Sequence, residues 1–259
     1  MIPDQVRALI QQGLGDIERE RAVRVLYACE SGSRGWGFAS KDSDYDVRFV
    51  YVHPVDWYLS VERHRDVIEL PISGDLDISG WDLRKALHLL RKSNPALLEW
   101  LSSPIVYRED APVMARFREL SREYYTPETC MRHYLHMASG NFREYLQGEK
   151  VWTKKYLYVL RPVLACRWIE GGHGPVPMAF ARLLEAVAPE GPVRTAIDSL
   201  LEQKRAAREL DEGDRIPVLN QFLGAEIERL KQRLAGTRAD VPPTDSLDAF
   251  FRWVLGPRA

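Results

Sequence analysis

The chain has 259 residues, of which 45% are hydrophobic, 28% charged and 10% aromatic. These ordinary globular values exclude a disordered, collagen-like or coiled-coil protein, and the length suits one large domain or two small ones. The formal net charge is −1, from 36 Lys and Arg against 37 Asp and Glu. This balance excludes a general basic coat for nucleic acid but permits a local basic groove.

The cysteine pattern and the hydropathy indicate a cytoplasmic protein. Cys29, Cys130 and Cys166 are far apart and odd in number, and no CxxC pair occurs, so neither a disulfide partner nor a structural zinc site is expected. Residues 1–20 predict a polar amphipathic helix rather than a signal peptide. No apolar run approaches the 18 residues of a membrane span, so no membrane association is expected.

The first part of the chain predicts alternating helix and strands. Helical spacing of apolar residues indicates a helix over 3–20. A β-branched and aromatic run predicts a strand over 24–33 that ends in small residues, and the clearest strand covers 44–52. The runs 66–72 and 76–79 flank a Ser-Gly-Asp turn and predict a hairpin.

Helices are predicted for the rest of the chain. The pattern Ser79-Gly80-Trp81-Asp82 fits a capping box and predicts a helix that starts at Ser79. Asn94 followed by Pro95 predicts a second helix start. Beyond about residue 112 no strand is predicted, and helical periodicity recurs over 112–124, 128–147, 151–170, 176–187, 192–208, 217–234 and 246–254. We therefore predict a mixed α/β domain over 1–110 and a helical domain over 111–259.

The stretch from Gly32 to Asp46 carries the chemistry. Its three glycines can bring backbone N–H groups close to a phosphate, and Ser33 adds a hydroxyl. Asp44 and Asp46 follow at the start of a strand, where a period of two sends both carboxylates to one face. Two carboxylates so close are costly without a cation between them. Mg²⁺ bridging triphosphate oxygens would supply that cation.

The same stretch resembles a known signature. Gly-Ser, then a short glycine-bearing stretch, then SDYD is similar to the signature of the DNA polymerase β-type nucleotidyltransferase superfamily. Three segments, ESGSRGWGFASKDSDYDVRFVYV, DISGWDLRKALHLLRKSNPALLEWLSSPIVY and KKYLYVLRPVLACRWIE, resemble the YcgL or RlaP family of predicted nucleotidyltransferases, which is proposed to act in RNA repair. The resemblance implies an α+β fold: a polymerase β-like palm of mixed sheet and helices, followed by an all-α domain that closes the active-site cleft.

The resemblance also implies a third carboxylate on a strand beside the Asp44–Asp46 pair, as a metal ligand and candidate base. We expect Asp77 in this role, because it is the polar residue of the strand 76–79, whose Leu76 and Ile78 face the other way. Glu69, on the preceding strand, and Asp75, at the turn, are the alternatives.

Phosphate-binding residues are expected in two places. Within the loop, the resemblance and the loop chemistry point to Gly32, Ser33 and Arg34, whose guanidinium can bind two phosphate oxygens. The superfamily commonly lends a Lys and a Tyr or Ser from its helical domain. In this chain the polar stripe of Lys154, Tyr158 and Arg161 matches, with Lys155 one position round, and the choice between the two lysines stays open.

The expected function is metal-dependent transfer of a nucleoside monophosphate from an NTP to a hydroxyl, with release of pyrophosphate. Two Mg²⁺ (or Mn²⁺) ions would be held by Asp44, Asp46 and Asp77. The expected acceptor is an RNA end, as in RNA repair or tRNA 3′-end modification. The alternatives are nucleotidylation of a protein or small molecule, as in toxin-like or antibiotic-modifying enzymes, and a non-catalytic nucleotide or RNA sensor. The intact Gly-Ser and Asp-x-Asp motif argues against the sensor.

Overall fold

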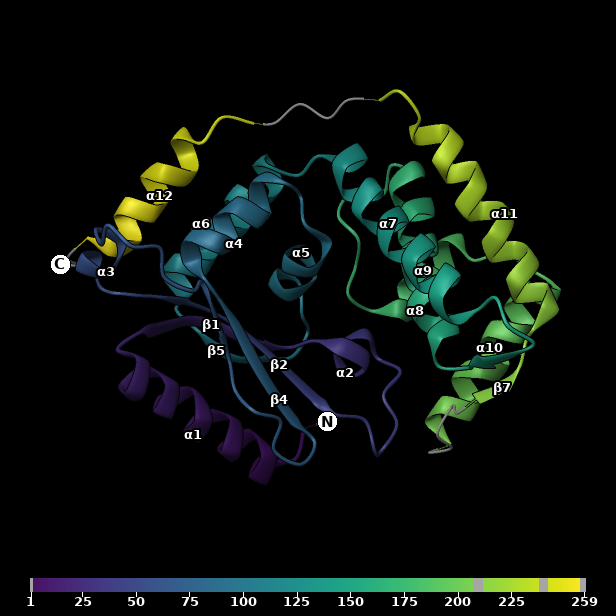
Figure 1. The fold of residues 1–259 in the computed structure, drawn as a ribbon, viewed down its shortest axis with the longest axis horizontal. Helices are drawn as coiled ribbons and strands as arrows, with labels where there is room; N and C mark the ends of the chain where they lie inside the picture. Colours follow the sequence, from purple (N-terminus) through teal and green to yellow (C-terminus); the bar gives the residue numbers. More distant parts are fainter. Residues whose placement is uncertain (1, 207–211, 238–241, 257–259) are drawn as a thin grey trace.

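A five-stranded mixed sheet forms the first half of the protein. The structure is a computed structural model that describes residues 2–206, 212–237 and 242–256 (Figure 1). The sheet order is β3-β4-β2-β1-β5, in which β1 is antiparallel to β2 and β5, β2 is parallel to β4, and β3 is antiparallel to β4. The strands are β1 (Arg24–Glu30), β2 (Tyr45–Val52), β3 (Val67–Glu69), β4 (Leu76–Asp82) and β5 (Val106–Glu109).

Helices cover both faces of this sheet (Figure 1). Helix α1 (Asp4–Arg21) buries Ile10, Leu14 and Ile17 in one cluster with inward side chains of β1 and β2. The other face packs in a second cluster against α4 (Leu83–Arg91), α5 (Pro95–Leu101), α6 (Ala111–Glu123) and α12 (Asp245–Leu255). Two short helices, α2 (Gly32–Trp36) and α3 (Val55–Tyr58), follow β1 and β2. These layers confirm the predicted α+β class, with a mixed sheet and many helices.

The second half is a helical bundle with its own core, beside the sheet in Figure 1. It contains α7 (Pro127–Tyr145), α8 (Lys155–Glu170), α9 (Phe180–Val187), α10 (Pro192–Arg205) and α11 (Pro217–Leu234), with a small ribbon of β6 (Lys150–Trp152) and β7 (Glu212–Asp214). Helix α8 lies at its centre and is buried on nearly all sides. Of the helices that the structure describes, none combines the length and apolarity needed to cross a membrane.

The hydrophobic clusters divide the chain at other places than the predicted boundary at residue 110. Helices α6 and α12 belong to the second-half sequence beyond residue 110, yet Val113, Phe117 and Phe250 share a core with the sheet helices α4 and α5. In Figure 1, α12 lies on the side of the molecule that holds α6 and the sheet, away from α11. The division at residue 110 stays a prediction about domains, whereas the hydrophobic clusters group α6 and α12 with the sheet.

The helix start at Asn94 and Pro95 is confirmed, because Asn94 Oδ1 accepts from the Leu97 N–H at 3.2 Å. The start at Ser79 is wrong. Residues 79–82 continue β4, whose main chain pairs with β2 through to Asp82. That ladder overrides the local capping pattern, and Asp82 itself caps α4 by accepting from the Arg84 N–H at 2.8 Å.

The remaining differences between the predicted and the observed elements concern short segments. Strands β5, β6 and β7 were not predicted, because three or four residues are too few to show a period of two. The glycine-bearing turn after β1 is the one-turn helix α2. The last residues of the predicted helix 192–208 lie outside the described residues.

Candidate active site

Two carboxylates face each other across the middle of the sheet. The parallel register of β2 and β4 sets Asp46 directly opposite Asp77. Arg48, two residues along β2 and therefore on the same face, donates from Nη2 to Asp46 Oδ1 at 2.9 Å and to Asp77 Oδ2 at 2.7 Å. A cationic group thus already bridges the two carboxylates. Sequence analysis missed Arg48, although its spacing from Asp46 placed it on this face.

Asp46 lies close to two other carboxylates, those of Asp77 and Asp44. Burial raises the pKa of its carboxyl, the Arg48 guanidinium lowers it, and the charges of Asp77 and Asp44 raise it further, with a net upward shift. A site in which a carboxylate is partly buried among other carboxylates favours a bound cation.

Gly32 makes room for this carboxylate. Its φ is +54°, in the left-handed region that favours glycine, and a Cβ at this position would lie 1.9 Å from Asp46 Oδ2. Gly32, which was expected to approach a phosphate, therefore also allows the loop to pass close to Asp46.

A buried glutamate holds the end of β1 against β2. Glu30 is fully buried, and its Oε1 accepts from the Asp46 N–H at 2.9 Å, while Oε2 accepts from the Tyr107 hydroxyl. The Ser31 N–H donates to the Asp46 carbonyl at 2.8 Å. Burial raises the pKa of Glu30, against the lowering effect of these hydrogen bonds. A charged residue directly after the apolar run 25–29 was the signal that could have identified Glu30.

A polar cleft of about 360 Å³ lies between the sheet and the helical bundle. One wall comes from the loop and the start of β2, the other from α8 and α10. The lining residues are Ser33, Phe38, Asp42, Ser43, Asp44 and Asp46 on the first wall, and Lys154, Lys155, Leu157, Tyr158 and Lys204 on the second. The structure thus brings together six predicted residues from two distant parts of the chain, and it adds Asp42 and Lys204, which were not predicted.

Tyr158 faces the carboxylates across this cleft. Burial around its hydroxyl raises the pKa of Tyr158, and the charges of Asp46 and Asp44 raise it further. The Lys155 ammonium lies 5.3 Å from the centroid of the Tyr158 ring. Lysines and a phenol hydroxyl therefore oppose the carboxylates, an arrangement that suits a phosphate chain bound between them.

The surroundings of the three candidate carboxylates differ. Asp77 pairs with Asp46 and shares Arg48 with it. Glu69 lies on β3, one strand further out, where its carboxylate accepts from Arg65 in an exposed ion pair. Asp75 is exposed, and its carbonyl accepts from the Tyr45 N–H at 2.7 Å. These positions favour Asp77 as the third carboxylate, which stays a prediction.

Arg34 and Arg161 do not line the cleft. Arg34 Nε donates to the Asp44 carbonyl at 3.1 Å, and its guanidinium stacks 4.0 Å above the Tyr45 ring, so it holds the loop before β2. Arg161 is only 2% exposed. Because α8 is buried all round, the predicted polar stripe reaches the cleft at Tyr158 but enters the core one turn later.

Arg161 belongs to a buried network between the two halves. It forms an ion pair with Glu99 at 3.0 Å, and Glu99 also accepts from Trp36 Nε1 at 2.9 Å and from the Tyr134 hydroxyl at 2.8 Å. The Trp36 ring packs edge-on against Tyr158, with centroids 5.5 Å apart. The network therefore ties α2, α5 and α7 to α8, directly behind the cleft.

The fit to a metal ion rests on the carboxylates. Among the residues that the structure describes, no group of three His, Cys, Asp or Glu side chains forms a ready-made metal cage. Mg²⁺ in nucleotide sites typically takes one or two carboxylates and completes its shell with waters and substrate phosphates. Asp46 and Asp77, with Asp44 at the cleft wall, offer the hard oxygen donors that this mode needs.

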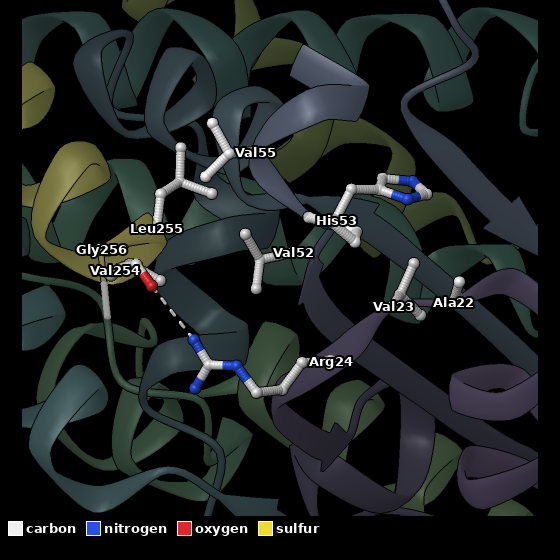
Figure 2. A pocket seen from close by; sticks show the side chains of 10 residues that line it. Ala22, Val23, Arg24, Val52, His53, Val55, Val254, Leu255 and Gly256 are labelled. Atoms are coloured by element: carbon white, nitrogen blue, oxygen red, sulfur yellow. Dashed lines mark hydrogen bonds between the residues drawn. The ribbon is translucent and has the colours of Figure 1, made fainter. Parts of the chain in front are cut away.

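A second cavity, of about 530 Å³, lies at the other end of β1 and β2 (Figure 2). Ala22 to Arg24, Val52 to Val55 and the end of α12 line it. Arg24 points into it and donates to the Val254 carbonyl at 3.2 Å, as well as to Asp110 at 2.7 Å. The described residues that line this cavity include no carboxylate side chain, whereas the polar cleft holds Asp42, Asp44 and Asp46, so the cleft is the candidate active site.

The chain matches a family model over most of its length. Residues 6–253 match the family described as "RlaP: RNA repair pathway DNA polymerase beta family". The chain belongs to this family. It is accordingly a nucleotidyltransferase of the polymerase β type, and the described cleft, with its Gly-Ser loop and paired aspartates, is the candidate catalytic centre of such an enzyme.

The chain is also similar to two other proteins. It is 51% identical over 225 residues to the "Uncharacterized protein YcgL" of Bacillus subtilis (strain 168), an alignment that covers 86% of each chain. A solved structure of a nucleotidyltransferase-like protein from Exiguobacterium sibiricum 255-15 aligns with 95% of this chain and 79% of its own, at 14% identity and a TM-score of 0.32.

Proposed function

We propose that this member of the RlaP family transfers a nucleoside monophosphate from an NTP to the hydroxyl of an RNA end, in a divalent-metal-dependent reaction. The observation that carries the proposal is the polar cleft that sets Asp44 and Asp46 opposite a wall of lysines, with Asp77 paired to Asp46 on the neighbouring strand. The family's assignment to RNA repair supports an RNA acceptor.

The proposed reaction forms one bond and breaks one. The acceptor hydroxyl oxygen attacks the α-phosphorus of the NTP, the bond from that phosphorus to the bridging oxygen of pyrophosphate breaks, and pyrophosphate leaves. The hydroxyl proton passes to a carboxylate, for which Asp77 is the candidate. Such catalysis depends mainly on positioning the reactants and stabilising charge.

The two walls of the cleft would have different roles, metal binding on one side and phosphate binding on the other. Asp44, Asp46 and Asp77 would hold Mg²⁺, which when bound lowers the pKa of the acceptor hydroxyl and neutralises phosphate charge. Lys154, Lys155 and Lys204 would bind the β- and γ-phosphates from the opposite side, together with the Ser33 hydroxyl. The buried Glu99–Arg161 network would keep α8 at a constant distance from the loop.

A labelling assay tests the proposal. Each α-labelled NTP is incubated with Mg²⁺ or Mn²⁺ and with total tRNA, a short RNA, or cell lysate, using an Asp44→Asn/Asp46→Asn double variant as the control. We expect label in RNA from the wild type alone. Label in a protein or in a small molecule would instead indicate nucleotidylation of that acceptor, and NTP binding without any transfer would indicate a sensor.

Substitution of each cleft lysine tests its role in nucleotide binding, with a lysine outside the cleft as the control. Lys154→Ala, Lys155→Ala and Lys204→Ala are expected to raise the KM for NTP by about tenfold each, since a charge-assisted contact to phosphate contributes roughly 1.5–3 kcal/mol. Lys150→Ala is the control, because Lys150 pairs with Asp214 outside the cleft. An unchanged KM in all three variants would remove this wall from the nucleotide site.

A further inference from the structure

We propose that an aromatic and lysine rim beside the cleft binds the acceptor as a single strand, by stacking its unpaired bases. The rim consists of Tyr145, Trp152, Lys154, Lys155 and Tyr158. This inference rests on the proposed function, in that it assumes an RNA acceptor, and it names the part of the protein that holds that acceptor.

The rim is continuous with the cleft. The Lys154 ammonium lies 5.6 Å from the Trp152 ring centroid, and the Lys155 ammonium lies 4.1 Å from that of Tyr145 and 5.3 Å from that of Tyr158. Lys154, Lys155 and Tyr158 also line the cleft, whereas Tyr145 and Trp152 stand outside its lining. The two lysines therefore connect the outer rings to the site of transfer.

Two of the three rings are accessible to solvent. Trp152 is 47% exposed and Tyr158 39%, whereas Tyr145 is partly buried against the helical core. Trp152 ends β6, whose ribbon with β7 fixes its backbone by pairing with Glu212. A large ring held open to solvent on a rigid backbone is suited to stacking, because little conformational entropy remains to be lost.

The combination of rings and lysines matches nucleic acid. Proteins that bind single strands pair a cationic track for the phosphates with aromatic faces for successive bases. Here each lysine lies within cation–π distance of a ring, so a strand could meet both groups at once. Nearby Glu212 and Asp214 limit the positive charge, and Lys150 already pairs with Asp214. Stacking, more than charge, would therefore supply the affinity.

The position outside the cleft distinguishes the acceptor from the NTP. The cleft, of about 360 Å³, holds the carboxylates and lysines that the nucleotide needs. Trp152 and Tyr145 do not line the cleft, but each lies within cation–π distance of a lysine that does. A terminal nucleotide of the acceptor placed at the carboxylates would leave its preceding bases over these rings.

Binding of a labelled single-stranded RNA of about ten nucleotides, a length within the usual range of single-strand sites, tests the proposal by fluorescence anisotropy. We expect Trp152→Ala to raise the Kd for this RNA about tenfold, the size of one lost base–aromatic stack, and Trp152→Phe to restore most of the affinity. The KM for NTP should stay within about twofold, because Trp152 is outside the cleft lining.

Trp253→Ala is the matched control. Trp253 is also a partly exposed tryptophan with a cation over its ring, since Arg116 Cζ lies 4.6 Å from its centroid, but it sits on α12 beside the sheet. Its removal should leave RNA affinity unchanged. Thermal melting of each variant checks that the fold persists.

Three other outcomes of these measurements would overturn the rim, reassign it to the nucleotide, or overturn the RNA acceptor. Unchanged RNA affinity in both Trp152→Ala and Tyr145→Ala, with normal wild-type binding, would overturn the rim while leaving the RNA acceptor intact. A raised KM for NTP with unchanged RNA affinity would assign the rings to the nucleotide base instead. Failure of the wild type to bind or label any RNA would overturn the RNA acceptor itself, and the rim with it.

Discussion

The backbone of Gly32 passes directly over the carboxylate of Asp46, so that a Cβ on Gly32 would lie 1.9 Å from Asp46 Oδ2. The glycine and the aspartate of the Gly-Ser and Asp-x-Asp motif are thus coupled by contact. The loop and α2 separate the two residues in the sequence. The hydrogen bond from the Ser31 N–H to the Asp46 carbonyl, at 2.8 Å, brings them together.

Gly32→Ala should therefore abolish most of the activity. The new methyl group has to displace the Asp46 carboxylate, and a misplacement of about 1 Å can cost on the order of 10²-fold in rate. Gly37→Ala is the matched control, because Gly37 also has a positive φ, of +86°, but open space around its Cβ position. Both variants should lose about 1–2 kcal/mol of stability from backbone strain. Equal activity losses in a transfer assay would show that strain alone is responsible.

Asp77→Asn should lower transfer about 10²–10³-fold, as expected for removal of one group that stabilises charge at the reacting centre. Glu69→Gln should leave it nearly unchanged, because Glu69 is exposed and pairs with Arg65. The measurement is kcat at saturating NTP and metal. The reverse result would make Glu69 the third carboxylate.

Asp46→Asn should raise the free energy of unfolding at neutral pH, even as it removes activity. The folded-state pKa of Asp46 is raised above its ordinary value of 3.8, mainly by burial and also by Asp77 and Asp44. Its ionisation therefore costs stability, which is greatest below pH 3.8 and falls as the pH rises through the folded-state pKa. Urea unfolding in metal-free buffer from acidic to neutral pH should show the variant's advantage growing with pH. A constant difference would contradict this assignment.

Arg48→Met should make the fold more dependent on divalent metal. Without the guanidinium, which donates to Asp46 at 2.9 Å and to Asp77 at 2.7 Å, the two carboxylates repel each other. We expect a lower melting temperature in chelator and a larger upward shift on addition of MgCl₂ than in the wild type. Asp46→Asn provides the comparison with a weakened metal site. A smaller shift in Arg48→Met than in the wild type would argue against metal binding by this pair.

Glu99→Gln should destabilise the protein by about 3–5 kcal/mol, because it leaves a buried guanidinium without its countercharge. Arg161 is 2% exposed, and within the described part of the chain its Nε and Nη1 have no hydrogen-bond partner. The Pro177 carbonyl, 3.2 Å from Nη2, and the Trp36 ring, whose centroid lies 4.9 Å from Cζ, are neutral and do not replace the carboxylate. The double variant Glu99→Gln/Arg161→Met should recover most of the loss. Urea denaturation measures both, and additive losses in the double variant would refute the coupling of the pair.

Local chemistry allowed the sequence to determine much of the fold. The β-branched and aromatic composition of β2 and the Asn94–Pro95 helix start depend on neighbours along the chain, and both predictions are confirmed. The Gly-Ser and Asp-x-Asp motif likewise lies within one short stretch, so the nucleotidyltransferase superfamily, the α+β class and the aspartates of the cleft could be inferred from it, while two further segments indicated the family.

Tertiary structure decided what distant segments do to each other. The parallel register that sets Asp46 opposite Asp77 joins strands separated by β3 and α3. Lys204 reaches the cleft from α10, and Arg161 is withdrawn into the core because α8 is surrounded by other helices. Likewise, β4 extends through Ser79 because β2 pairs with it. In each case long-range hydrogen bonding or burial, which no local pattern records, outweighed the local preference.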